Sequence, residues 1–225
     1  MNHPNSTFNH PIENWIFANA AARVAAGTYV AGDVGKVAFQ QDNNTYWRLT
    51  ATTPTWVPLN EQSNSSTALQ TPAAATRTYI TGSALAIGKL TIGAVLRWHF
   101  NMTKTAAGSA ASTFDIAFGT LGTTGDTARV SFTKPAGTTA IDEGWVEIEC
   151  IIRGPISASG IAVGEFTLLH NGNTVGHAII PVVVLNTVSA TFDMTTPTFV
   201  GVCITSGTGD VITIQQVTAE AIGLG

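Results

Sequence analysis

The sequence has few charged residues. They make up 11% of the 225 residues, whereas an average soluble protein has about a quarter. The formal net charge is −4 and Lys and Arg form no cluster, which argues against binding to nucleic-acid phosphates and gives no support to binding at an anionic membrane. Two interpretations stay open: identical subunits cover much of the surface, or the protein is an extracellular or virion component selected for robustness.

Cysteine and long apolar runs are also scarce. Cys150 and Cys203 each lie inside a strand-like run, and no Cys-x-x-Cys or Cys/His ligand spacing occurs, so no zinc site is predicted. Both are expected to be buried, unbridged thiols of a chain made in a reducing cytosol. No apolar run reaches the roughly 18 residues of a membrane span. Residues 1–27 show no basic region followed by an apolar core, so no signal peptide is expected.

Motifs for catalysis and metal binding are missing as well. No Gly-x-Ser-x-Gly frame occurs, and His99, His170 and His177 have no second ligand at metal-binding spacing. Glu147 and Glu149 lie two apart on one strand face, where a shared acid–base role is geometrically possible, but a solvated strand face is the favoured interpretation. The sequence therefore predicts no enzyme activity, no catalytic residue, no cofactor and no metal.

Two further features are candidates for ligand binding. Trp98 or Trp145, if exposed, would stack on a sugar ring, although packing in the core is the default expectation for both. The oxygen-rich stretches 42–44 and 207–210 match no calcium loop and are expected to be plain turns.

What the sequence does have is alternation between polar and apolar residues. From residue 79 onward, about eight or nine strand patterns follow one another at turn spacings of roughly ten residues. The clearest is 144–154, and Asn171-Gly172 is a strong hairpin signal. The residues of 144–154 expected to point inward are Val146, Ile148, Cys150 and Ile152. The predicted fold class is all-β, with a jelly-roll β-sandwich over residues 79–225.

Residues 1–60 show a different pattern and are predicted to form a separate N-terminal module. Residues 18–26 are expected to form one short helical turn. A small β-meander follows, with a turn at 42–44. Its predicted strands are 36–40, 45–52 and 55–59. A meander of this size needs a partner surface for stability. Residues 61–78 have no apolar period and are predicted to be a linker.

Residues 18–59 contain a recognisable series of short motifs. An Ala/Arg segment leads into Asp-x-Gly-Lys-Val, then an aromatic residue, an Asp/Asn turn, Thr-Tyr-Trp and a last Trp. The residues that carry this order are Asp33, Gly35, Lys36, Phe39, Asp42, Tyr46, Trp47 and Trp56. The segment resembles a module of tailed-bacteriophage virion proteins, which looks like an attachment element near the N-terminus of fibres and decoration proteins.

The resemblance implies a protein of the virion surface. We expect a head fibre or capsid decoration protein that stabilises the shell or adheres to host glycans, with a tail fibre or receptor-binding tip as the alternative. Expected partners are further copies of the chain in a homotrimer, the major capsid or tail protein, and a host surface glycan. The predicted anchor or interface residues are Trp15, Phe17, Phe39, Tyr46, Trp47 and Trp56. A carbohydrate-active enzyme on a β-sandwich and a cellular adhesin are the alternatives from other classes.

Overall fold

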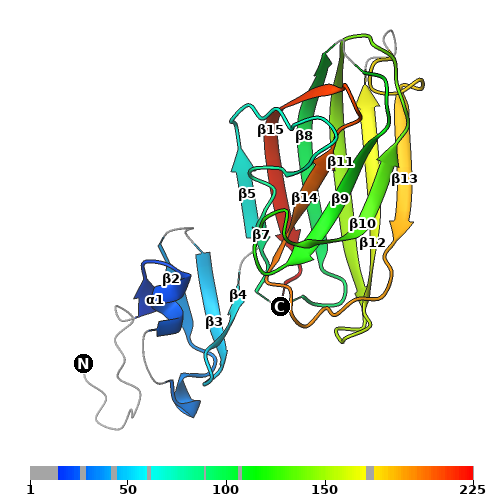
Figure 1. Ribbon diagram of the computed structural model, residues 1–225. Coiled ribbons are helices and arrows are strands. Elements are labelled where there is room, and N and C mark those ends of the chain that lie inside the picture. The colour runs from blue at the N-terminus through cyan, green and yellow to red at the C-terminus, as the bar shows by residue number, and fades with distance from the viewer. Residues whose placement is uncertain are drawn as a thin grey trace. The chain divides into compact units, whose positions relative to one another are not determined.

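The computed structural model describes residues 15–25, 29–41, 45–59, 62–88, 90–105, 108–170 and 175–224. The chain divides into two compact units, one containing the residues up to 61 and one containing residues 62–223. Strands dominate both units (Figure 1), so the predicted all-β class is confirmed. The predicted turns at 42–44 and 171–172 lie outside the described residues, as do residues 1–14.

The described part of the first unit is a sheet of order β1-β2-β3-β4 with one short helix. Its elements are β1 (Ile16–Phe17), α1 (Ala20–Ala25), the 3-10 turn η2 (Ala31–Asp33), β2 (Val37–Gln40), β3 (Thr45–Ala51) and β4 (Thr55–Pro58). Strands β2, β3 and β4 form the predicted antiparallel meander. Strand β1, for which the sequence shows no signal, pairs with β2 in parallel and places Ile16 opposite Phe39.

The turn before β2 is fixed by residues of the Asp-x-Gly-Lys pattern. The Asp33 carboxylate accepts a hydrogen bond from the backbone N–H of Val30 at 3.0 Å and pairs with Lys36 Nζ at 2.8 Å. Gly35 has a φ of +95°, which favours glycine, and its N–H donates to the carbonyl of Leu49 at 2.8 Å. These pattern residues therefore hold the local fold of the first unit.

The first unit has a hydrophobic core of its own. The buried residues of this core are Trp15, Phe17, Tyr29, Ala38, Trp47, Leu49 and Trp56. The ring of Trp56 lies 5.7 Å from that of Trp15 and 5.6 Å from that of Tyr29. The Arg23 guanidinium of α1 lies 3.7 Å from the centre of the Trp47 ring, a cation–π contact. The partner surface that the meander needs is thus supplied within the same unit, by β1, α1 and Tyr29.

The second unit is a β-sandwich built from two sheets. Within the described residues, one sheet has the order β13-β12-β11-β8-β15-β5 and the other β10-β9-β14-β6, with β7 beside β14. The long strands are β8 (Val95–Thr105), β9 (Ser112–Gly119), β10 (Thr127–Lys134), β11 (Asp142–Gly154), β12 (Ile161–His170), β13 (Val182–Val188), β14 (Phe199–Thr205) and β15 (Val211–Ile222). The short strands are β5 (Gln62–Ser66), β6 (Arg77–Tyr79) and β7 (Leu85–Ala86). The predicted jelly-roll sandwich is confirmed.

Alternation along β11 shows how the sandwich core forms. Its predicted inward residues Val146, Ile148, Cys150 and Ile152 are all fully buried. Cys203 on β14 is buried too, and both cysteines are free thiols, as predicted. Burial raises the pKa of each thiol to about 12, so both stay protonated at neutral pH.

Residues 62–78, predicted as a linker, instead belong to the second unit. Strand β5 pairs antiparallel with β15, placing Ser66 opposite Val217, and β6 pairs with β14. The Arg77 guanidinium of β6 donates to both carboxylate oxygens of Asp115, at 2.6 and 2.9 Å. The linker prediction, which rested on the polar composition of this segment, is wrong because backbone pairing at the edge of a sheet requires no apolar alternation.

Candidate functional site

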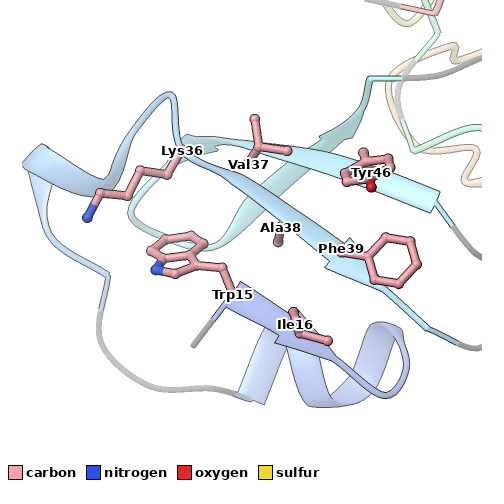
Figure 2. Close-up of a pocket in the computed structure, with 7 residues that line it drawn as sticks. All are labelled: Trp15, Ile16, Lys36, Val37, Ala38, Phe39 and Tyr46. Carbon is pink, nitrogen blue, oxygen red and sulfur yellow. The ribbon is translucent and has the colours of Figure 1, made fainter. Parts of the chain in front are cut away.

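A groove of about 530 Å³ lies on the surface of the first unit (Figure 2). Its lining residues are Trp15, Ile16, Lys36, Val37, Ala38, Phe39 and Tyr46. Ile16 and Phe39 are register partners in the parallel pair of β1 and β2. Phe39 in turn lies opposite Tyr46 in the antiparallel pair of β2 and β3. Backbone pairing of the three strands therefore sets the lining of the groove.

The groove exposes large apolar side chains. Ile16, Val37 and Tyr46 are 47%, 45% and 46% exposed, and the rings of Phe39 and Tyr46 pack with centroids 5.0 Å apart. Figure 2 shows Lys36 at the end of the groove away from these two rings. An apolar lining of this size suits contact with an apolar surface of another molecule.

The six predicted anchor residues fall into two groups. Phe39, Tyr46 and Trp15 line the groove, although Trp15 is only 7% exposed. The other three, Phe17, Trp47 and Trp56, are buried in the core of the first unit. The sequence pattern did not identify four of the lining residues, Ile16, Lys36, Val37 and Ala38, as interface residues. A β-branched residue two positions before Phe39 on the same strand face was the signal for Val37.

The outward face of the six-stranded sheet carries a band of charged side chains. Arg97 of β8 pairs with Glu149 of β11 at 2.7 Å and with Glu220 of β15 at 3.7 Å. One row along, His99 lies 3.2 Å from Glu147. The two glutamates share one face, as predicted, but each contacts its own basic partner. This arrangement matches the solvated strand face that the sequence favours over a pair of carboxylates sharing a proton.

An exposed tryptophan stands on the same face. Trp145 is 38% exposed and stacks on His99, with ring centroids 5.6 Å apart and planes 24° apart. A hollow of about 250 Å³ adjoins it, lined by Asn101, Met102, Thr103, Glu143, Gly144, Trp145 and Gln215. Gln215 lies at an irregularity of β15 and donates to Thr103 Oγ1 at 2.7 Å. Trp98 is fully buried, so of the two predicted candidates Trp145 alone can stack on a sugar.

Polar and charged side chains gather in the interior at one end of the sandwich. They are Lys104, Lys134, Asp142, His170, His177 and Asp210. His170 Nδ1 lies 2.7 Å from Asp142 Oδ2, and the same oxygen accepts the backbone N–H of His177 at 3.0 Å. Lys134 Nζ donates to the carbonyls of Pro135 and His177. The sequence gives no signal for this cluster because its members come from strand ends and connections spread between residues 104 and 210.

Burial changes the protonation of two members of this cluster. It lowers the pKa of His177 to about 4, against the opposing effect of Asp142. It also lowers the pKa of Lys134 to about 8, against the opposing effect of Asp210. The His177 imidazole is therefore neutral at pH 7, while Lys134 can exchange a proton close to neutral pH.

In the part of the chain that the structure describes, no group of three or more His, Cys, Asp or Glu side chains is arranged to hold a metal ion. None of the described helices is long and apolar enough to cross a membrane.

Comparison with known proteins returns structural likeness alone. No protein-family model and no curated protein matches the chain. Among solved structures it is similar to a lectin from Bauhinia forficata in complex with GalNAc, at 11% identity and a TM-score of 0.32, covering 87% of this chain and 95% of the lectin. It is also similar to an alginate lyase, at 12% identity and a TM-score of 0.32, covering 88% of this chain and 93% of that one. At these scores the likeness assigns no residue a role.

Proposed function

We propose that this protein is a non-enzymatic surface protein of a tailed-phage virion, of the head-fibre or capsid-decoration type. In this proposal the first unit docks on the particle and the second unit is displayed. The observation that carries the proposal is the exposed apolar groove on a unit whose own core is already filled. A tail fibre or receptor-binding tip remains the alternative with the same division of labour.

The groove has the chemistry of a docking site. Its exposed lining combines two aliphatic side chains, Ile16 and Val37, with the aromatic pair Phe39 and Tyr46. Interfaces are enriched in aromatic residues at their centres, where a few large side chains supply most of the binding energy. The partner that this lining fits is an apolar segment of the major capsid or tail protein.

The phage-like sequence pattern supports the same assignment. Asp33, Gly35 and Lys36 hold the turn before β2, and Trp47 and Trp56 lie in the core. These pattern residues account for the fold of the module. Lys36, Phe39 and Tyr46 are the described pattern residues that line the groove, so they are the ones that can meet a partner.

Self-association rests on a separate apolar surface. Strand β13 ends the six-stranded sheet among the described strands, and Val182, Val184 and Val188 are 46–55% exposed on it. An open, apolar edge strand is a template for pairing with another chain. We assign this edge to contact between copies in the expected homotrimer. Light scattering should give a trimer mass for the natural chain and a monomer mass for Val184→Glu.

Glycan adhesion is a second candidate role, favoured by the exposed face of Trp145. The aromatic ring, the amides of Asn101 and Gln215 and the carboxylate of Glu143 surround one hollow, and a sugar needs such an apolar plane beside polar groups. The flanking glutamates disfavour anionic polysaccharides. Binding of neutral oligosaccharides that Trp145→Ala abolishes, and Leu169→Ala on the same face preserves, would support this role. Equal binding by both variants would remove it.

The docking proposal is tested on particles that lack this protein. The purified full chain should bind them and sediment with them, whereas a chain that begins at Gln62 should stay in the supernatant. Since residues 62–223 form a compact unit with its own core, circular dichroism can check that the shortened chain is folded. If the shortened chain binds as well as the full chain, the first unit is not the docking element.

A further inference from the structure

Lys104 and Asp210 face each other inside the second unit. Lys104 is the penultimate residue of β8, and Asp210 directly precedes the neighbouring strand β15. Their side chains are 1% and 0% exposed, and Lys104 Nζ lies 3.7 Å from Asp210 Oδ1. The register fixes this proximity: Lys104 pairs with Ile212, which is two residues beyond Asp210 and therefore on the same side of the strand.

The contact between them is a poor ion pair. Lys104 Nζ donates its hydrogen bond to the carbonyl of Thr138 at 2.7 Å. Both carboxylate oxygens of Asp210 are buried without a hydrogen-bond partner among the described residues. A charged hydrogen bond normally spans about 2.7–2.9 Å, and a buried ion pair is stabilising only when its remaining lone pairs are also satisfied. Asp210 meets neither condition.

We propose that Lys104 and Asp210 condense to form an intramolecular isopeptide bond. A proton passes from the ammonium to the carboxylate, and the neutral Nζ then adds to Cγ of Asp210. The N–C bond forms, the C–O bond breaks, and the oxygen leaves as water with a second proton from nitrogen. No oxidant or cofactor is required because nothing is oxidised or reduced. The product replaces two buried charges by one neutral amide, which removes their desolvation penalty.

The surroundings of the pair suit these proton transfers. Asp142 of β11 is the register partner of Lys104 on its other side, so Lys104 lies between two carboxylate-bearing segments. Lys134 interacts electrostatically with Lys104, Asp142 and Asp210, and its lowered pKa lets it accept or donate a proton near neutral pH. The N–H of Asp210 donates to the carbonyl of Gly207 at 3.0 Å, which fixes the turn that presents the carboxylate.

Such a bond would link β8 covalently to the start of β15. A cross-link between residues this distant in the chain restricts the unfolded ensemble strongly and thereby stabilises the fold. It would also persist in denaturant and under reducing agents, unlike a disulfide. If the proposed function is correct, a permanent link of this kind suits a unit that is displayed on a particle.

The test is the intact mass of the full chain, measured under denaturing conditions after purification of the folded protein. The mass should be lower than the sequence mass by one water molecule. Proteolysis should release a branched peptide that joins Lys104 to Asp210. Lys104→Arg and Asp210→Ala should each give the full mass of their own sequences, while Lys36→Arg, a matched exchange in the first unit, should keep the loss of water.

The natural chain decides the question even if the variants fail to fold. A folded natural chain with the full sequence mass would overturn the proposal. A loss of water that proteolysis maps to any other pair of residues would overturn it equally.

Discussion

The two units build their hydrophobic cores from different kinds of side chain. The first unit fills its core largely with aromatic rings, and a guanidinium lies over one of them. The second unit buries alternating aliphatic and phenylalanine side chains from two sheets, such as Ile116, Ile148, Val202 and Phe166. A small unit has a low ratio of volume to surface, so each residue must bury more area. Tryptophan and tyrosine supply that area, at about 150–250 Å² each.

The difference also concerns what remains exposed. The sandwich turns a charged band and one tryptophan outward, while the first unit leaves an apolar groove on its surface. In the proposed function, a full core together with an apolar groove separates stability from docking: some aromatic residues hold the fold, and others would contact the partner. The following changes are chosen to separate these two roles.

The largest effect is expected from Trp47→Ala. Removing this buried ring deletes the surface on which Arg23 packs and should cost about 3–5 kcal/mol. The first unit should then lose its near-ultraviolet circular dichroism signal, while the thermal transition of the second unit stays in place. Tyr46→Ala, at the adjacent exposed position, is the control and should leave the first unit folded. Loss of both transitions in Trp47→Ala would show that the units do not fold separately.

Arg77→Ala should act on the second unit alone. It leaves the carboxylate of Asp115 buried and without its bidentate partner, which should cost about 3 kcal/mol. The midpoint of the second unit in a urea titration should fall accordingly. Arg153→Ala, at an exposed position, should change it little. Equal midpoints for both variants would mean that the Arg77–Asp115 pair contributes nothing to the stability of the sandwich.

His177 should make the second unit sensitive to acid. Its pKa is lowered from 6.5 to about 4, so the unfolded chain binds the proton first as pH falls. The stability that neutral, buried His177 contributes is fully present above pH 6.5 and is lost as pH falls toward 4. The unfolding free energy of the second unit should fall by roughly 3 kcal/mol in total over this range. His177→Gln should flatten the fall in unfolding free energy over this interval. Parallel pH profiles for His177→Gln and the natural chain would contradict the assigned pKa shift.

The smallest effect on stability is expected from Tyr46→Ser. The side chain is nearly half exposed, so the first unit should lose less than about 1 kcal/mol. Binding to particles should nevertheless weaken, because the ring belongs to the groove. A large loss of stability in this variant would place Tyr46 among the residues that hold the fold.

Alternation of polar and apolar residues predicted the features that depend on neighbouring residues, namely the strands and their inward faces. The alternation in 144–154 identified the inward residues of β11, and the alternation between residues 36 and 59 predicted three paired strands. The pairing of β1 with β2 escaped prediction because two residues carry no period and their partner lies more than twenty positions away. Strand β5 escaped because serine and asparagine side chains do not reveal a strand that is held by its backbone.

The functional surfaces were predicted only in part for a related reason. A list of aromatic residues cannot separate those of the core, such as Trp56, from those of the groove, such as Phe39, until the strand register assigns each a face. The buried cluster around Asp142 could not be predicted from the sequence, because its residues lie at the ends of different strands or in the connections between them and meet only in the folded sandwich. Contacts between segments distant in sequence depend on the sandwich topology, which periodicity does not encode.

The measurement that tests the central claim most directly compares two matched substitutions in binding to particles that lack the protein. Val37 lines the groove and is 45% exposed, and Val30 is 56% exposed in the same unit but outside the groove lining. With circular dichroism confirming that both variants are folded, Val37→Asp should lower the fraction of chain that sediments with the particles at least tenfold. Val30→Asp should bind like the natural chain. Undiminished binding by Val37→Asp would contradict the assignment of the groove as the docking site.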